Sequence, residues 1–146
     1  MHEYLFRGKR KDNGEWVEGS LVTKVDPLLE TNYCFILAQG RGESFVTWHM
    51  VDPATVGQFT GLMDKNGKRI FEGDIVRFEY TGKNLGVEGV ETVIFECGKF
   101  GVKWGWHKDF VCLDGFANTT KEIIGNIHDN PELIGGRFDV GYTFRV

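Results

Sequence analysis

The segment QFTGLMDKNGKRIFEGDIV, Gln58–Val76, contains two strand patterns, a tight turn and a sharp corner in close succession. Val56–Leu62 is predicted to be a strand, Asp64–Gly67 the turn, and Arg69–Phe71 a short returning strand. The corner follows at Glu72–Asp74, where glycine permits the bend and aspartate can accept hydrogen bonds from the turn backbone. This segment therefore predicts a fold made of short strands and tight turns.

Short strands separated by turn residues are also predicted on both sides of this segment. We expect them over Tyr4–Arg10, Glu15–Lys24, Asn32–Ala38, Glu43–Val51, Ile75–Tyr80, Glu91–Glu96, Phe100–Trp106, Phe110–Leu113 and Lys121–Ile127. Glu43–Val51 has large residues on both sides of its alternation, which predicts burial on more than one face. Thr81–Gly89 contains three glycines and is predicted to be a mobile loop. Asn130-Pro131 is predicted to begin one short helical turn, with Asn130 as the N-cap.

The composition places the chain in the mainly all-β class. Among 146 residues there are 20 glycines, three prolines and 12 phenylalanines, as expected for many strands joined by tight turns. The length suits a single domain or two small β subdomains. The candidate subdomains are residues 1–57 and 58–134, and residues 135–146 are predicted to be an extension that forms a final strand.

Charge and cysteine content disfavour several classes of function. The net charge of −4 and the pI of about 5.6 disfavour non-specific binding to a phosphate backbone. The three cysteines have no CxxC spacing, and the histidines have no zinc-site spacing, so no metal site is predicted. No apolar stretch is long enough to span a membrane and no signal core is present, which predicts a cytosolic protein.

The sequence predicts no catalytic residue and no cofactor. There is no GxSxG elbow, no GxxxxGK[ST] loop and no GxGxxG motif. Glu72 and Asp74 could act as an acid and a base, but a corner that hydrogen-bonds its own backbone explains them better. We therefore expect a protein that is not an enzyme.

Six residues are candidates for contact with a partner. They combine basic side chains near the start of the chain with an aromatic and basic run after residue 100: Arg7, Arg10, Trp104, Trp106, His107 and Lys108. Exposed aromatic residues beside lysines could anchor a protein or stack on bases. The favoured interpretation of the aromatic run is nevertheless a buried core, because a domain of this size needs large apolar residues inside.

Three motifs together resemble the YopX family, small proteins of phages and prophages of Gram-positive bacteria. They are the opening FR element from Phe6, the TGL-x-DKNG-x-x-IFEGDIV centre, and the closing IIGNI-x-x-NPEL of Ile123–Leu133. Gly8 departs from the Ala-Trp pair that often follows the opening arginine, and the chain extends beyond Leu133. The resemblance implies a mostly β fold, a phage or prophage origin, the host cytoplasm as the location, and self-association. It implies no catalytic residue.

Two functional hypotheses follow, and a hydrolytic enzyme that uses Glu72 and Asp74 ranks third behind them. The first is a non-enzymatic accessory protein, a β module that binds a host or phage protein and forms a homo-oligomer. The second is a nucleic-acid-binding barrel that acts near phage replication or recombination. The Gly-Asp corner is typical of SH3-like barrels, so we expect one or two small SH3-like barrels, a fold-level analogy that supports no function by itself.

Overall fold

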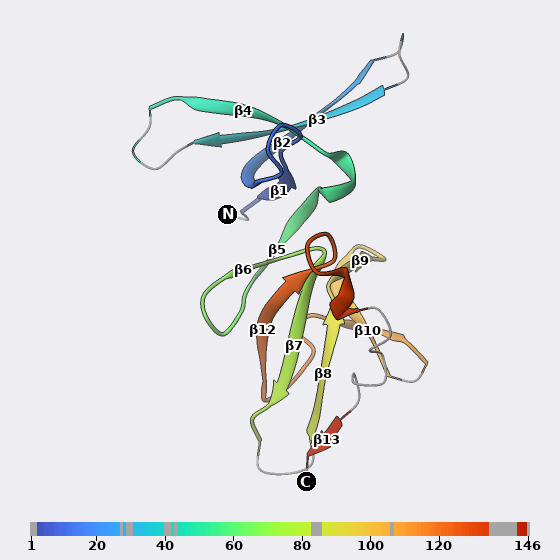
Figure 1. The fold of residues 1–146 in the computed structure, drawn as a ribbon. Coiled ribbons are helices and arrows are strands. Elements are labelled where there is room, and N and C mark those ends of the chain that lie inside the picture. Colours follow the sequence, from blue (N-terminus) through green and yellow to red (C-terminus); the bar gives the residue numbers. More distant parts are fainter. Residues whose placement is uncertain are drawn as a thin grey trace. The chain divides into compact units, whose positions relative to one another are not determined.

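A computed structural model of the chain describes residues 3–26, 28, 31–39, 42, 44–82, 86–105, 107–134 and 143–145, without the side chains of residues 25, 26, 31, 32, 86, 87 and 143–145. The chain divides into two compact units, Met1–Phe59 and Thr60–Val146 (Figure 1). The described residues form antiparallel strands and two 3-10 turns. The predicted mainly all-β class is thereby confirmed.

Unit 1 is built on one antiparallel sheet. Its strands follow the order β4-β3-β2-β1-β5, so that β3 lies between β2 and β4 (Figure 1). Their bounds are β1 Phe6–Lys9, β2 Trp16–Asp26, β3 Thr31–Gln39, β4 Val46–Val51 and β5 Gly57–Met63, with the 3-10 turn η1 at Pro53–Thr55. A turn joins β1 to β2, in which Gly14 has φ of 72° and its N–H donates to the Arg10 carbonyl.

The core of unit 1 lies on one face of this sheet. Ile36 and Val51 are fully buried and Cys34 is nearly so. Four partly buried side chains pack against them: Phe6, Val17, Leu21 and Val56. The strand register pairs Cys34 with Val51, so both side chains lie on the core face. Because side chains alternate along a strand, those of the adjacent residues in β3 and β4 point to the opposite face.

Unit 2 contains two further antiparallel sheets. One has the order β12-β7-β8-β13 and the other β11-β10-β9. The bounds are β6 Arg69–Phe71, β7 Asp74–Tyr80, β8 Gly86–Thr92, β9 Ile94–Glu96, β10 Lys99–Trp104, β11 Asp109–Cys112, β12 Thr119–Asn126 and β13 Thr143–Arg145, with the 3-10 turn η2 at Pro131–Leu133. Residues 60–63 of β5 also belong to this unit, where β5 pairs with β6.

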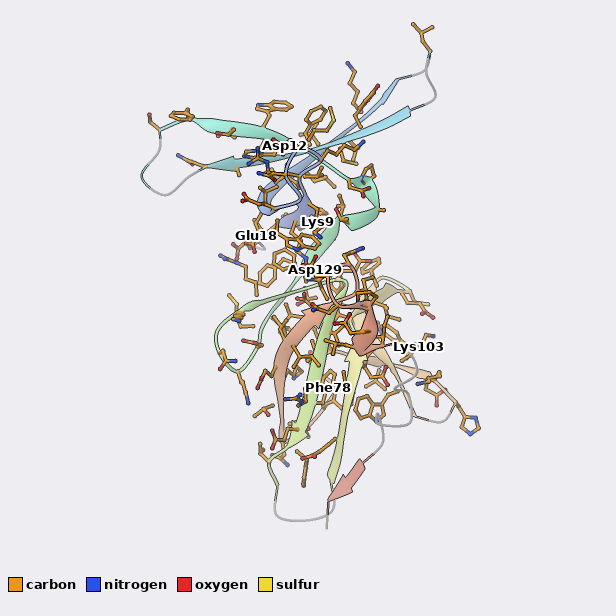
Figure 2. All side chains as sticks on the ribbon, in the orientation of Figure 1. Lys9, Asp12, Glu18, Phe78, Lys103 and Asp129 are labelled. Atoms are coloured by element: carbon orange, nitrogen blue, oxygen red, sulfur yellow. The ribbon has the colours of Figure 1, made fainter. Side chains whose placement is uncertain are left out.

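The core of unit 2 is centred on Phe78, which is labelled in Figure 2, and partly buried aromatic rings pack against it. Phe78 is fully buried, and its ring lies 5.5 Å from that of Trp104 and 4.7 Å from that of Phe116. The buried aliphatic residues around it are Ile70, Val76, Val93, Val102 and Leu113. Trp104, which is partly buried, thus packs against this core, as the favoured interpretation of the aromatic run expects for this residue.

The Glu72–Asp74 corner joins three parts of unit 2. Gly73 has φ of 91°, a conformation that favours glycine. The buried Asp74 carboxylate accepts a hydrogen bond of 2.7 Å from the Phe71 N–H. The Gly73 N–H donates to the Val93 carbonyl, and the Gly73 carbonyl accepts from Ile127. The predicted bond from the aspartate to the turn backbone is therefore confirmed.

Asp64 connects the tight turn of the central segment to β12. One carboxylate oxygen accepts hydrogen bonds from the Asn66 and Lys68 N–H groups at 2.8 and 2.9 Å. The other accepts from the Ile123 N–H at 3.1 Å. Burial of Asp64 raises the pKa of its carboxyl, but these backbone hydrogen bonds and the Lys68 charge outweigh burial, so the pKa is lowered.

The lowered pKa of Asp64 predicts a loss of stability in acid. Asp64 stabilises the fold fully above its unfolded pKa of 3.8, and this contribution is lost as the pH falls through the lower folded value. We expect the stability difference between wild type and Asp64→Asn, measured by urea unfolding, to be constant near neutral pH and to shrink below about pH 4. A difference that stays constant into stronger acid would contradict this assignment.

Two sequence predictions about unit 2 need correction. Gly86–Gly89 lies in strand β8, where Gly89 pairs with Phe78, so Thr81–Gly89 is not a loop throughout; residues 83–85 lie outside the described residues. Glycine content suggested a loop, but a glycine in a strand also lets neighbouring backbones approach closely. In η2, the Asn130 side chain does not cap the turn but accepts a hydrogen bond from the Asn126 N–H.

The predicted SH3-like barrels are not confirmed. The sheets in the described ranges are open, and no barrel closes. Closure requires the two edges of a sheet to pair along their length, and the edge strands β9 and β13 have three residues each. Residues 135–146 were predicted to form an extension strand. Within this range Thr143–Arg145 forms β13, which pairs with β8, and the other residues lie outside the described part of the chain.

Candidate functional site

Strand β4 carries a row of large apolar side chains in contact with solvent. Phe45, just before the strand, is 63% exposed; Val46 is 49%, Trp48 58% and Met50 39% exposed. We call these four side chains the β4 surface. The predicted burial of this strand on more than one face is therefore wrong. Because β4 lies at the end of its sheet, β3 is its only neighbour along most of its length in the described residues.

Three residues of the β4 surface, Val46, Trp48 and Met50, share a face that continues across the neighbouring strands. Register pairs Trp48 with Leu37, Met50 with Phe35, and Phe35 with Val22, so these side chains share one face of the sheet. The Phe35 and Trp48 rings meet edge to face, with centroids 5.9 Å apart. Val22 is 37% exposed. This face lies opposite the core of unit 1, and contiguous exposed apolar side chains of this kind mark interaction sites.

At one end of β4, the backbone groups on its outer edge already form hydrogen bonds. The Met50 carbonyl accepts a hydrogen bond of 3.0 Å from the Lys11 N–H, and the Asp52 N–H donates to the Lys9 carbonyl at 2.8 Å. In an antiparallel strand, alternate residues direct their backbone groups to the same edge. The backbone groups of Val46 and Trp48 therefore point outward as those of Met50 do, and we call them the β4 edge. Within the described ranges, no strand pairs with this edge.

A shallow pocket of about 320 Å³ lies beside the β4 edge. It is lined by Arg10, Lys11, Asp12, Trp48, His49 and Met50. The Arg10 guanidinium donates to both carboxylate oxygens of Asp12, with Nε at 2.9 Å from Oδ1. This hydrogen bond lowers the pKa of Asp12 and raises the pKa of Arg10. The ion pair is solvent-exposed, so water screens it, and it provides the polar side of the pocket.

The structure places the basic candidates near the start of the chain in unit 1. The Arg7 guanidinium lies 4.7 Å from the centre of the Trp16 ring, and Lys9 Nζ lies 5.7 Å from it. Such cation–π contacts stabilise the pairing of β1 with β2, in which Arg7 is opposite Glu18 and Lys9 opposite Trp16. Of the predicted partner-contact residues in this unit, Arg10 alone lines the pocket beside β4.

The later candidates belong to unit 2. Trp104 packs against Phe78 and Phe116. His107 is exposed, and Lys108 adopts φ of 53° with its Nζ 3.8 Å from a Glu91 carboxylate oxygen. Trp106 lies outside the described residues. The described part of the run therefore divides between a core residue, Trp104, and a turn that carries His107 and Lys108.

The described residues offer little that suggests hydrolytic or metal chemistry. Asp74 is 1% exposed and accepts a hydrogen bond from the Phe71 N–H, so its carboxylate holds the corner. No group of three or more His, Cys, Asp or Glu residues that could hold a metal occurs among the described positions. No helix in this part of the chain is long and apolar enough to cross a membrane.

Sequence reasoning missed the β4 surface, although one signal was present. Ser44–Val51 contains no Asp, Glu, Lys or Arg. Edge strands usually carry charged residues that discourage pairing with another chain. Without the strand order, an uncharged run of large residues is indistinguishable from an inner strand. Once β4 is known to lie at an edge, the same run indicates an interface.

Comparison with known proteins agrees with the fold. The family model described as YopX protein matches residues 5–135. The crystal structure of protein EF1440 from Enterococcus faecalis is 24% identical with a TM-score of 0.54, and the similarity covers 91% of this chain and 99% of that one. The crystal structure of protein yopX from Bacillus subtilis is 19% identical with a TM-score of 0.55, covering 89% and 97%. At these identities the similarity concerns the fold alone. No curated protein sequence matches the chain.

Proposed function

The chain belongs to the YopX family, and from this premise we propose that it is a non-enzymatic protein-binding module. The observation that carries the proposal is the β4 surface, in which Phe45, Val46, Trp48 and Met50 are exposed at a sheet edge. Aromatic residues and methionine are enriched where proteins bind one another. A partner that covered these side chains would remove their apolar area from water, which favours association.

The backbone and the pocket support the same function. An extended segment of a partner could pair with the β4 edge, where the backbone groups of Val46 and Trp48 point outward. Main-chain hydrogen bonds provide affinity in this mode of recognition, and pockets for alternate side chains provide specificity. The pocket beside Trp48 and His49 has a suitable position for one such side chain. We propose that this accessory protein originates from a phage or prophage and acts in the host cytoplasm.

One observation favours nucleic-acid binding as the second candidate function. Trp48 is exposed, and it lines the pocket together with Arg10 and Lys11. Aromatic rings beside basic groups can stack on the bases of single strands. The net charge of −4 disfavours this function, and Asp12 partly neutralises Arg10. Protein binding therefore remains the leading proposal.

Capture experiments with matched variants test the proposal. Tagged wild type, Trp48→Thr and Phe95→Thr are used to capture proteins from phage-infected host lysate, with and without nuclease. Threonine suits a strand, and Phe95, 51% exposed in unit 2, is the matched control. We expect Trp48→Thr to reduce the recovered partner about tenfold or more and Phe95→Thr to leave it unchanged.

Two results would contradict protein binding at β4. Equal recovery with wild type and Trp48→Thr would show that the β4 surface is not the binding site. Loss of all partners after nuclease treatment would favour the nucleic-acid function. In that case, binding of single-stranded DNA or RNA should weaken as salt rises and should weaken further in Trp48→Thr.

A further inference from the structure

We propose that the partner strand at the β4 edge is β4 of a second copy of this chain, in antiparallel pairing centred on Thr47. This inference rests on the proposed function and specifies its partner. The axis of two-fold symmetry would pass beside Thr47, so that Val46 of one copy is opposite Trp48 of the other. A two-fold interface of this kind is self-complementary, because each chain supplies the same residues to it.

The backbone restricts where a second strand can pair. Lys11 already donates to the Met50 carbonyl on the outer side of β4, so an added strand has to pair nearer the start of the strand. Val46 and Trp48 remain, and their backbone groups point outward. In pairing centred on Thr47, each Val46 would exchange both backbone hydrogen bonds with Trp48 of the other copy. The hydrogen bond from Lys11 to Met50 thus selects this register over one centred on Trp48.

The lack of charged residues in the segment favours a second copy as the partner. Ser44–Val51 contains no Asp, Glu, Lys or Arg, so symmetric pairing brings no like charges together although the whole chain carries −4. Like charges directly opposite each other destabilise paired strands. The Val46–Trp48 pair would place a β-branched side chain against an aromatic one, and both are about half exposed in one copy. Such pairs are favourable across antiparallel strands.

The pocket gives the second copy an aromatic side chain to bind. In this register Phe45 of the second copy would lie opposite His49, which lines the pocket of about 320 Å³. Phe45 is 63% exposed in one copy. By symmetry, Phe45 of the first copy would lie beside the equivalent pocket of the second. Each copy thus offers one exposed aromatic ring and one pocket, as a self-complementary interface requires.

Charge substitution at Thr47 tests the register directly. Thr47 is exposed, and in the proposed dimer it is opposite itself. We expect wild type to sediment as a dimer of 16.6 kDa chains, whereas Thr47→Lys and Thr47→Glu should each associate about tenfold more weakly or worse. An equimolar mixture of the two variants should restore a dimer, because opposite charges would then face each other. Thr23→Lys, at an exposed position on β2, is the control and should remain dimeric.

The outcomes separate this inference from the proposed function. Circular dichroism and urea unfolding of each variant establish that it is folded. A monomeric wild type, or dimers unaffected by both Thr47 substitutions, would overturn pairing at this edge. Failure of the mixed variants to associate would overturn the register. If wild type is monomeric while Trp48→Thr still abolishes capture of another protein, the β4 surface binds a different chain: the proposed function stands and this inference fails.

Discussion

Replacing Asp64 by alanine is expected to lower the free energy of unfolding by about 2–4 kcal/mol. The substitution leaves three backbone donors without their carboxylate acceptor, those of Asn66, Lys68 and Ile123. An unsatisfied buried donor costs about 1–3 kcal/mol, and water can reach those donors that lie in the exposed turn. Asp64 is 6% exposed, so the bond to Ile123 should account for much of the loss. Urea unfolding followed by tryptophan fluorescence measures the effect.

Two comparison variants make the Asp64 experiment specific. Asp64→Asn retains a carbonyl oxygen as an acceptor and should lose about half as much stability as Asp64→Ala. Asp114→Ala removes an exposed aspartate from another turn of unit 2 and should change stability by less than about 0.5 kcal/mol. If Asp64→Ala were as stable as Asp114→Ala, the hydrogen bonds of Asp64 would not stabilise the fold.

Replacing Phe78 by alanine is expected to destabilise the protein by about 3–5 kcal/mol. Phe78 is fully buried, and its ring packs against those of Trp104 and Phe116. Alanine would leave a cavity between the two remaining rings and would remove the contacts that hold Trp104 in the core. We also expect the emission of Trp104 to shift to longer wavelength, because its indole would become more exposed to water. Equilibrium unfolding and fluorescence spectra give both readouts.

The matched control for Phe78 is another phenylalanine of unit 2. Phe95 is 51% exposed, and its ring lies 4.9 Å from that of Phe100. Phe95→Ala should cost about 1 kcal/mol or less, since half of the side chain already contacts water. Phe78→Leu should fall between the two, because it fills part of the cavity. Equal losses for Phe78→Ala and Phe95→Ala would contradict the assignment of Phe78 to the core.

Much of the fold could be predicted because the relevant interactions are local. The turns at Gly14 and Gly67 have φ of 72° and 78°, a conformation that favours glycine. The corner at Gly73 and the bond from Asp74 to Phe71 join residues that are neighbours in sequence. The packing of Trp104 against the core was also predictable, because a small domain needs its large apolar residues inside. Asp64 was predicted as a turn residue, but its bond to Ile123 spans 59 positions along the chain and no local pattern indicates it.

The candidate site was much less predictable than the fold. The sequence by itself determined a chain of short strands, the glycine turns between them, the structural use of Asp74 and membership of the YopX family. Only the tertiary structure decided which strand lies at an edge. Phe45, Val46 and Trp48 would have the same alternation in an inner strand, where they would form a core. Burial depends on what covers each face and edge of a strand, and strand order is set by pairing between distant segments. Here that pairing leaves β4 at the end of its sheet, so its apolar side chains are exposed to a partner.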